Sequence, residues 1–123
     1  MQAELMRLRS AFRYAWAGVV FLFRNEPNAR IHLALAIIAA LLAWWTGFSA
    51  TEWAILAVVI GVVLVAEAMN TAIEALTDLV SPQRHPHAKI AKDVAAGAVS
   101  LAALMSVIAA LFLFIPRFLM MLH

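Results

Sequence analysis

The chain has 123 residues, of which 66% are hydrophobic and only 13% are charged, and its mean hydropathy is +0.94. Soluble domains contain about 45–50% apolar residues, so the composition excludes an ordinary soluble domain and predicts one integral membrane domain over residues 1–123. The net charge of +2 does not indicate nucleic-acid binding here, because basic residues at membrane edges explain it. The absence of cysteine excludes disulfides and thiolate metal sites.

Residues 1–25 are predicted to form an amphipathic helix that lies in the membrane interface. Its larger apolar residues share one helical face: Leu5, Leu8, Phe12, Trp16, Val19 and Phe23. Arg9, Arg13 and Arg24 flank that face, and their side chains are long enough to reach lipid headgroups. Arg7 and Tyr14 lie on the opposite face, free to contact something soluble. Charges are interspersed through the segment and no cleavage site follows an apolar core, so a signal peptide is not expected.

The first membrane helix is predicted over residues 29–48, after a break around Glu26 and Pro27. Proline is tolerated in the first turn of a helix but not inside one. The following apolar run is almost long enough to cross a hydrocarbon core of about 30 Å. Glu26 has two interpretations that the sequence does not separate, a site residue or an acid favoured by the helix macrodipole. His32 is interpreted as a polar contact between helices, because no second histidine lies at ligand spacing.

Two further membrane helices are predicted over residues 52–80 and 93–116. The intervening segment 81–87 is expected to be a loop, because its two prolines prevent a continuous helix. Asp93 is expected to be the N-cap of the last helix. Alanine and glycine are frequent in the first turns of that helix, and such small residues let another helix approach closely.

Basic residues gather on one side of the predicted spans. They are Arg7, Arg9, Arg13, Arg24 and Arg30 before the first span, and Arg84, Lys89 and Lys92 between the second and third. The turn between the first two spans has no basic residue, and only Arg117 lies after the third span. The positive-inside rule therefore predicts that the N-terminus and the loop at 81–87 are cytoplasmic.

A polar stripe follows an apolar run, residues 53–66, on the second membrane helix. At about 100° per residue its members fall within an arc of about 100°: Glu67, Asn70, Thr71, Glu74 and Asp78. Ionisable groups on a membrane helix are costly, so they usually mark a pathway or a reaction site. The alternative is a helix that has already left the bilayer and a solvated polar face. We favour that alternative for Asp78 alone, and a functional role for Glu67, Asn70 and Glu74.

The predicted topology places a set of groups suited to phosphoryl transfer at one membrane face. Glu26 and Glu74 come from two helices, and Mg²⁺ on phosphate substrates is commonly held by one or two carboxylates. Lys92 offers a positive charge to phosphate, and the deeper Glu67 is placed to accept a proton from a lipid hydroxyl. Metal, cation and positioned base are what phosphoryl transfer requires. The glycine-rich phosphate loop of soluble kinases is absent.

Two stretches of the sequence carry a resemblance to a known family. They are Glu67-x-x-Asn70-Thr71-Ala72-Ile73-Glu74-x-x-x-Asp78 and His85-Pro86-x-Ala88-Lys89-x-Ala91-Lys92-Asp93-x-Ala95-Ala96-Gly97-Ala98-Val99. The turn at Asn25-Glu26 and the segment Tyr14-x-Trp16-x-Gly18 match as well. Together they resemble the signature of the prokaryotic diacylglycerol kinase family, which includes the undecaprenol kinases. The resemblance covers nearly the whole chain.

The resemblance implies an all-α homotrimer of three-span subunits, with an interfacial N-terminal helix and active sites shared between neighbouring chains. It implies that Glu67 is the proton acceptor and that Glu26 and Glu74 bind Mg²⁺ linked to ATP. The residues expected to contact ATP are Tyr14, Glu26, Asn70, Glu74, Gln83, Arg84, His85, Lys92 and Asp93. Arg7 and Trp16 are expected to contact the lipid substrate. Gln83 and Arg84 stand where diacylglycerol-specific members have an acidic-aromatic pair.

Two other functional classes are weaker interpretations of the same sequence. A transporter or channel with a glutamate relay needs polar groups across the whole bilayer, but residues 53–66 and 99–115 nearly lack ionisable groups. A structural subunit would leave the polar stripe without a role. The resemblance implies an ATP- and Mg²⁺-dependent lipid kinase of the bacterial cytoplasmic membrane. Undecaprenol is favoured over diacylglycerol as acceptor, because residues 30–32 and 85–89 look more like the undecaprenol kinase branch.

Overall fold

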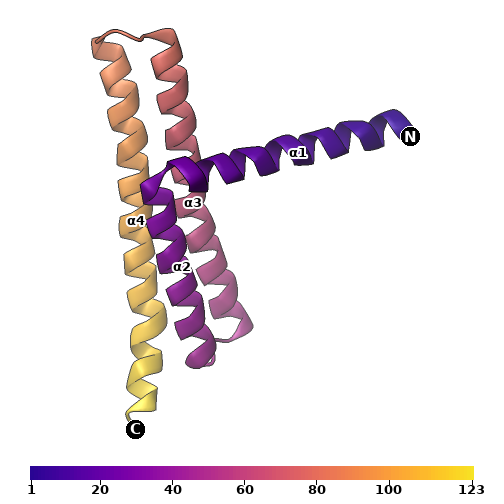
Figure 1. Ribbon diagram of the computed structural model, residues 1–123. Coiled ribbons are helices and arrows are strands. Elements are labelled where there is room, and N and C mark those ends of the chain that lie inside the picture. Colours follow the sequence, from indigo (N-terminus) through magenta and orange to yellow (C-terminus); the bar gives the residue numbers. More distant parts are fainter.

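The computed structural model describes all 123 residues as four helices joined by short connections (Figure 1). The helices are α1 (Gln2–Asn25), α2 (Pro27–Trp45), α3 (Ala50–Val80) and α4 (Pro86–Met121). Helices α2, α3 and α4 are each long and apolar enough to cross a membrane. Figure 1 shows these three side by side, with α1 leaving them as a separate arm. The prediction of an all-α membrane protein with three spanning helices is confirmed.

The corner between α1 and α2 consists of a single residue. Glu26 has an extended backbone (φ −103°, ψ 108°), and Pro27 occupies the first turn of α2. Proline has no N–H to donate and its φ is fixed near the helical value, so it begins a helix readily. The Asn25 side chain donates to Phe21 O at the end of α1 (2.9 Å), and Arg30 donates across the corner to the Arg24 carbonyl. Two helices therefore meet with almost no connecting chain.

The turn between α2 and α3 is closed by local hydrogen bonds. Gly47 has a positive φ of 71°, a conformation that residues with a Cβ adopt rarely. Ser49 and Glu52 form a capping box, in which Ser49 Oγ accepts from the Glu52 N–H and Glu52 Oε2 accepts from the Ser49 N–H. Because Ser49 is the cap, α3 begins at Ala50, two residues before the predicted start.

The buried core lies at the same end of the bundle as this turn. It contains Ala43, Phe48, Leu56, Leu113 and Phe114. The ring centroids of Phe48 and Phe114 are 4.8 Å apart, a separation typical of interacting aromatic pairs. At this end Arg117 also pairs with Glu52, donating from Nε to Oε1 at 3.0 Å and from Nη2 to Oε2. The aromatic contact and the ion pair hold the turn, α3 and α4 together.

The loop between α3 and α4 is shorter than predicted, because α4 begins at Pro86 rather than at residue 93. His85 is the N-cap, and its Nδ1 accepts from the His87 N–H at 3.2 Å. The prediction of Asp93 as N-cap was wrong, since Pro86 starts the helix in the manner described for Pro27 and Asp93 lies in its third turn. At its other end α4 passes through Pro116 and continues to Met121. Proline is better tolerated in membrane helices, where neighbouring groups satisfy the freed carbonyl.

The three spanning helices differ greatly in length. At 1.5 Å per residue α2 is about 28 Å long, α3 about 46 Å and α4 about 54 Å, against a hydrocarbon thickness of about 30 Å. Figure 1 shows the α3–α4 hairpin extending well past the corner between α1 and α2. A hydrocarbon slab that contains α2 therefore leaves the hairpin end of α3 and α4 outside it.

Candidate active site

The polar stripe on α3 becomes steadily more exposed toward the hairpin end. Glu67 is only 2% exposed and is the one charged residue among those buried. Asn70, Thr71 and Glu74 are half-buried, and Asp78 is exposed. This order agrees with the predicted depths, and with Asp78 alone facing water. The buried end of the stripe is the part that requires an explanation, because a buried carboxylate is costly unless it is paired.

Glu67 has one basic neighbour, and that neighbour comes from α2. His32 Nε2 lies 3.1 Å from Glu67 Oε1, which confirms the interpretation of His32 as a polar contact between helices. The two groups are at hydrogen-bond distance but not aligned for a hydrogen bond, so Oε1 has no hydrogen-bond partner. Asn70 Oδ1 and Thr71 Oγ1 are buried and unpartnered as well. Native proteins leave few buried polar atoms unpaired, so three on one helix face mark this face as one suited to form hydrogen bonds with a ligand or another chain.

One turn farther along, the side chain of Asn70 orients the carboxylate of Glu74. Asn70 Nδ2 donates to Glu74 Oε1 at 3.2 Å, across an i,i+4 spacing that places both on one face. The amide restricts the Glu74 side chain while its remaining oxygen lone pairs stay available. Asn70 is therefore placed to hold Glu74 in a fixed orientation.

A polar hollow of about 650 Å³ lies at the hairpin end, where α3, the loop and α4 meet. It brings together five of the predicted ATP contacts, namely Gln83, Arg84, His85, Lys92 and Asp93. Lys92 forms an ion pair with Asp78 on α3, and Lys89 forms one with Asp93. The volume is within the range of ordinary small-molecule sites, and the hollow carries both cations and hydrogen-bonding groups.

The predicted site residues of α1 are not brought to this hollow within one chain. Arg7, Tyr14 and Trp16 are exposed, and Figure 1 shows α1 running away from the hairpin. The guanidinium carbon of Arg13, the neighbour of Tyr14 on the helix, is 5.3 Å from the Tyr14 ring centroid. Glu26 is half-buried at the corner and forms no ion pair. A single chain thus assembles the α3–α4 part of the predicted site but not the α1 part.

No group of three or more potential metal-binding side chains forms in the chain. Mg²⁺ on a nucleotide needs only one or two carboxylates, since phosphates and water supply the other ligands. Glu26 and Glu74 offer oxygen donors of the type that Mg²⁺ prefers, and Glu74 is held by Asn70 with lone pairs to spare. The donor set therefore fits a nucleotide-bound Mg²⁺ rather than a metal held by protein alone.

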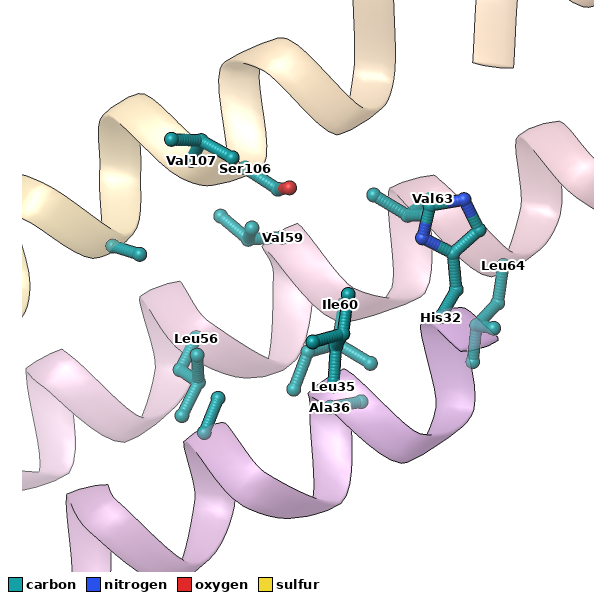
Figure 2. A pocket seen from close by; sticks show the side chains of 12 residues that line it. His32, Leu35, Ala36, Leu56, Val59, Ile60, Val63, Leu64, Ser106 and Val107 are labelled. Atoms are coloured by element: carbon teal, nitrogen blue, oxygen red, sulfur yellow. The ribbon is translucent and has the colours of Figure 1, made fainter. Parts of the chain in front are cut away.

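An apolar cleft of about 230 Å³ lies on the opposite side of His32 from the hairpin, between α2, α3 and α4 (Figure 2). Ten of its twelve lining residues are hydrophobic, and the two polar ones are His32 and Ser106. Figure 2 shows the imidazole at one end of this cleft. His32 therefore borders both the apolar cleft and the buried carboxylate of Glu67.

The family model described as prokaryotic diacylglycerol kinase matches residues 13–114 of the chain. The chain belongs to this family. The undecaprenol kinase of Bacillus subtilis is 39% identical over 114 residues, which are 93% of this chain and 93% of that protein. The diacylglycerol kinase of Synechocystis is 43% identical over 107 residues, 86% of this chain and 61% of that protein. The diacylglycerol kinase of Pseudomonas aeruginosa is 36% identical over 97 residues, 79% of each chain.

Membership in this family makes the chain a lipid kinase. The prediction of a phosphotransferase is confirmed, and the interpretations as a transporter or as a structural subunit are set aside. The three spanning helices agree with a multi-pass membrane protein. The family match includes the whole polar stripe, the hollow and the corner at Glu26.

Proposed function

We propose that this protein transfers the γ-phosphoryl group of ATP, in the presence of Mg²⁺, to the hydroxyl of a membrane lipid alcohol, with undecaprenol favoured over diacylglycerol. The observation that carries the proposal is the buried Glu67, whose Oε1 has no hydrogen-bond partner. This carboxylate lies between an apolar cleft and the half-buried Asn70 and Glu74, in a chain of a lipid kinase family. A lipid hydroxyl would approach it from the apolar cleft, past His32, which lines the cleft and lies 3.1 Å from the carboxylate.

In the proposed reaction, Glu67 accepts the proton of the lipid hydroxyl. The lipid oxygen forms a new bond to the γ-phosphorus while the bond from that phosphorus to the β,γ-bridging oxygen breaks and ADP leaves. A base within hydrogen-bond reach of the reacting hydroxyl typically contributes about 10²- to 10⁴-fold in rate. Burial of Glu67 also excludes water, which would otherwise compete with the lipid as acceptor.

The nucleotide is proposed to bind from the hollow toward Glu74. Lys92 and Asp93, with Gln83, Arg84 and His85 of the loop, line the polar hollow, and Lys92 supplies a cation for phosphate. Glu26 and Glu74 would hold the Mg²⁺ that neutralises charge on the β- and γ-phosphates. Asn70 would keep Glu74 in place for this role. The proposed path leads from the exposed hairpin to the buried carboxylate along one face of α3.

We further propose a homotrimer whose active sites are shared between neighbouring chains. Only 10 of the 123 residues are buried in one chain, and the residues of α1 that are expected to bind ATP or lipid, Tyr14, Arg7 and Trp16, do not reach the hollow of their own chain. A neighbouring chain would bring them there. Helix α1 would lie in the cytoplasmic interface, with the N-terminus and the hairpin in the cytoplasm, as the distribution of basic residues favours.

The acceptor is tested by direct competition. Purified protein is incubated with ATP and Mg²⁺ and with undecaprenol and diacylglycerol at equal mole fraction in one detergent, and the phosphorylated lipids are separated. We expect undecaprenyl phosphate to form with the higher specificity constant. A higher specificity constant for diacylglycerol would reverse the choice of acceptor, and phosphorylation of neither lipid would contradict the proposed reaction.

A further inference from the structure

His32 is a polar side chain at the buried end of the site that the proposed reaction does not use. It projects from α2, and its side chain is 21% exposed while that of Glu67 is 3% exposed. The distance of 3.1 Å between His32 Nε2 and Glu67 Oε1 is already that of a hydrogen bond. A small rotation of either side chain would align the N–H with the oxygen that has no partner.

No other charged side chain competes for Glu67. Every other ion pair that involves α3 or α4 lies elsewhere: Arg117 with Glu52, Lys92 with Asp78, and Lys89 with Asp93. Arg30, the nearest basic residue of α2 in sequence, donates to the Arg24 carbonyl. The other polar side chain in the cleft, Ser106, donates to Ala103 O within its own helix. The imidazole is therefore the only basic group within 4 Å of the buried carboxylate.

We propose that His32 is a positioning residue for Glu67, a role that rests on the proposed function of Glu67 as base. In this arrangement His32 Nε2–H donates to Glu67 Oε1 and fixes the carboxylate, so that Oε2 is left to accept the proton of the lipid hydroxyl. The neutral imidazole with its proton on Nε2 is sufficient for this. A carboxylate held at one oxygen presents the other in a single direction, which is what a general base requires.

The donor, rather than the volume of the side chain, is what this proposal requires of residue 32. His32→Gln retains an N–H at nearly the same reach, whereas His32→Leu fills the space without a donor. We expect His32→Leu to lower kcat about 10- to 100-fold, the range set by losing a hydrogen bond to a charged group, with the KM for Mg·ATP nearly unchanged. His32→Gln should restore kcat to within about threefold of the unmodified protein.

The test compares these variants with a matched control and a second background. Ser106→Ala changes the other polar residue of the cleft and should leave kcat unaltered. In a Glu67→Gln background, His32→Leu should cause no additional loss, because a residue that acts only through Glu67 has nothing left to position. Binding of a fluorescent ATP analogue and the melting temperature report on folding, and His32→Phe serves as a second donor-free variant if the Leu variant does not fold.

Three results would overturn the inference. They are near-normal kcat in both donor-free variants, equal losses in the Gln and Leu variants, and a loss from His32→Leu that persists in the Glu67→Gln background. Failure of the proposed function would give a different result from failure of this inference. It would appear as near-normal turnover in Glu67→Gln with His32 intact.

Discussion

Asp78 on α3 and Lys92 on α4, fourteen residues apart in the chain, form an ion pair at the edge of the polar hollow. The Asp78 side chain is 65% exposed and that of Lys92 is 39% exposed. Exposed ion pairs contribute little to stability. The main effect of this pair is to hold the Lys92 ammonium group at the hollow. Asp78, which the sequence alone suggested to be a solvated residue, therefore also holds the ammonium group of Lys92, a proposed phosphate contact.

The first prediction concerns this pair. Asp78→Asn should leave the melting temperature nearly unchanged, because the pair is exposed, but should weaken ATP binding because Lys92 is no longer held at the hollow. We expect a rise of several-fold, up to about 10-fold, in the KM for ATP. Steady-state kinetics at saturating lipid measure it, and Glu52→Gln, which breaks the ion pair with Arg117 at the opposite end of α3, is the control. An unchanged KM would show that Asp78 does not assist nucleotide binding.

The second prediction concerns the proposed base. Glu67→Gln retains the size and hydrogen-bonding ability of the side chain but cannot accept the proton, so turnover should fall by about 10²- to 10⁴-fold. Nucleotide binding should persist, because the hollow lies at the other end of the stripe. Kinase assays with a lipid alcohol and binding of an ATP analogue separate these two effects. Turnover near that of the unmodified protein would remove Glu67 from its role as base.

The third prediction concerns the metal. Glu26→Gln and Glu74→Gln should each raise the Mg²⁺ concentration needed for half-maximal activity, by about 10-fold or more, since each removes one of at most two protein carboxylates. Titration of activity with Mg²⁺ at fixed ATP measures the change. Glu52→Gln again serves as the control. If both variants retain the original Mg²⁺ dependence, the metal is bound by other residues.

The fourth prediction concerns stability at the far end of the bundle. Phe48 is 8% exposed and contacts Phe114 and Trp53, so Phe48→Ala should destabilise the protein by roughly 3–5 kcal/mol. Trp44→Ala, at a residue that is 77% exposed, should have a much smaller effect. Thermal unfolding in detergent measures both. The kcat of folded Phe48→Ala should be normal, because the proposed site is at the other end of α3, and a large loss of kcat would contradict that separation.

The sequence was sufficient to predict the three spanning helices and the polar face of α3, because both depend on local patterns. Apolar runs set the spans, and the helical repeat alone places Glu67, Asn70 and Glu74 on one face. The helix α4 begins earlier than predicted, because His85 rather than Asp93 is its N-cap. The prediction uses the prolines of the loop only as helix breakers, whereas Pro86 occupies the first turn of a helix, where it is favoured.

Contacts between helices could not be predicted in the same way. The pairing of Glu52 with Arg117 joins residues 65 positions apart, and that of His32 with Glu67 depends on how far α2 is shifted along α3. Such registers follow from packing across the whole bundle rather than from any local pattern. The signal for His32 was present, as the one ionisable residue of the apolar run 31–48, but the sequence did not identify its partner.

The corner at Glu26 has a mechanical consequence. One residue joins α1 to α2, and apart from Leu22 every residue of α1 is at least partly exposed in the chain, so the tilt of this arm is set mainly by its surroundings. The same residue carries a carboxylate that is proposed to bind metal. Any rotation of α1 about Glu26 therefore also displaces the Glu26 carboxylate. Bilayer curvature or lateral tension acting on α1 would in this way be transmitted to the metal ligand without passing through the rest of the bundle.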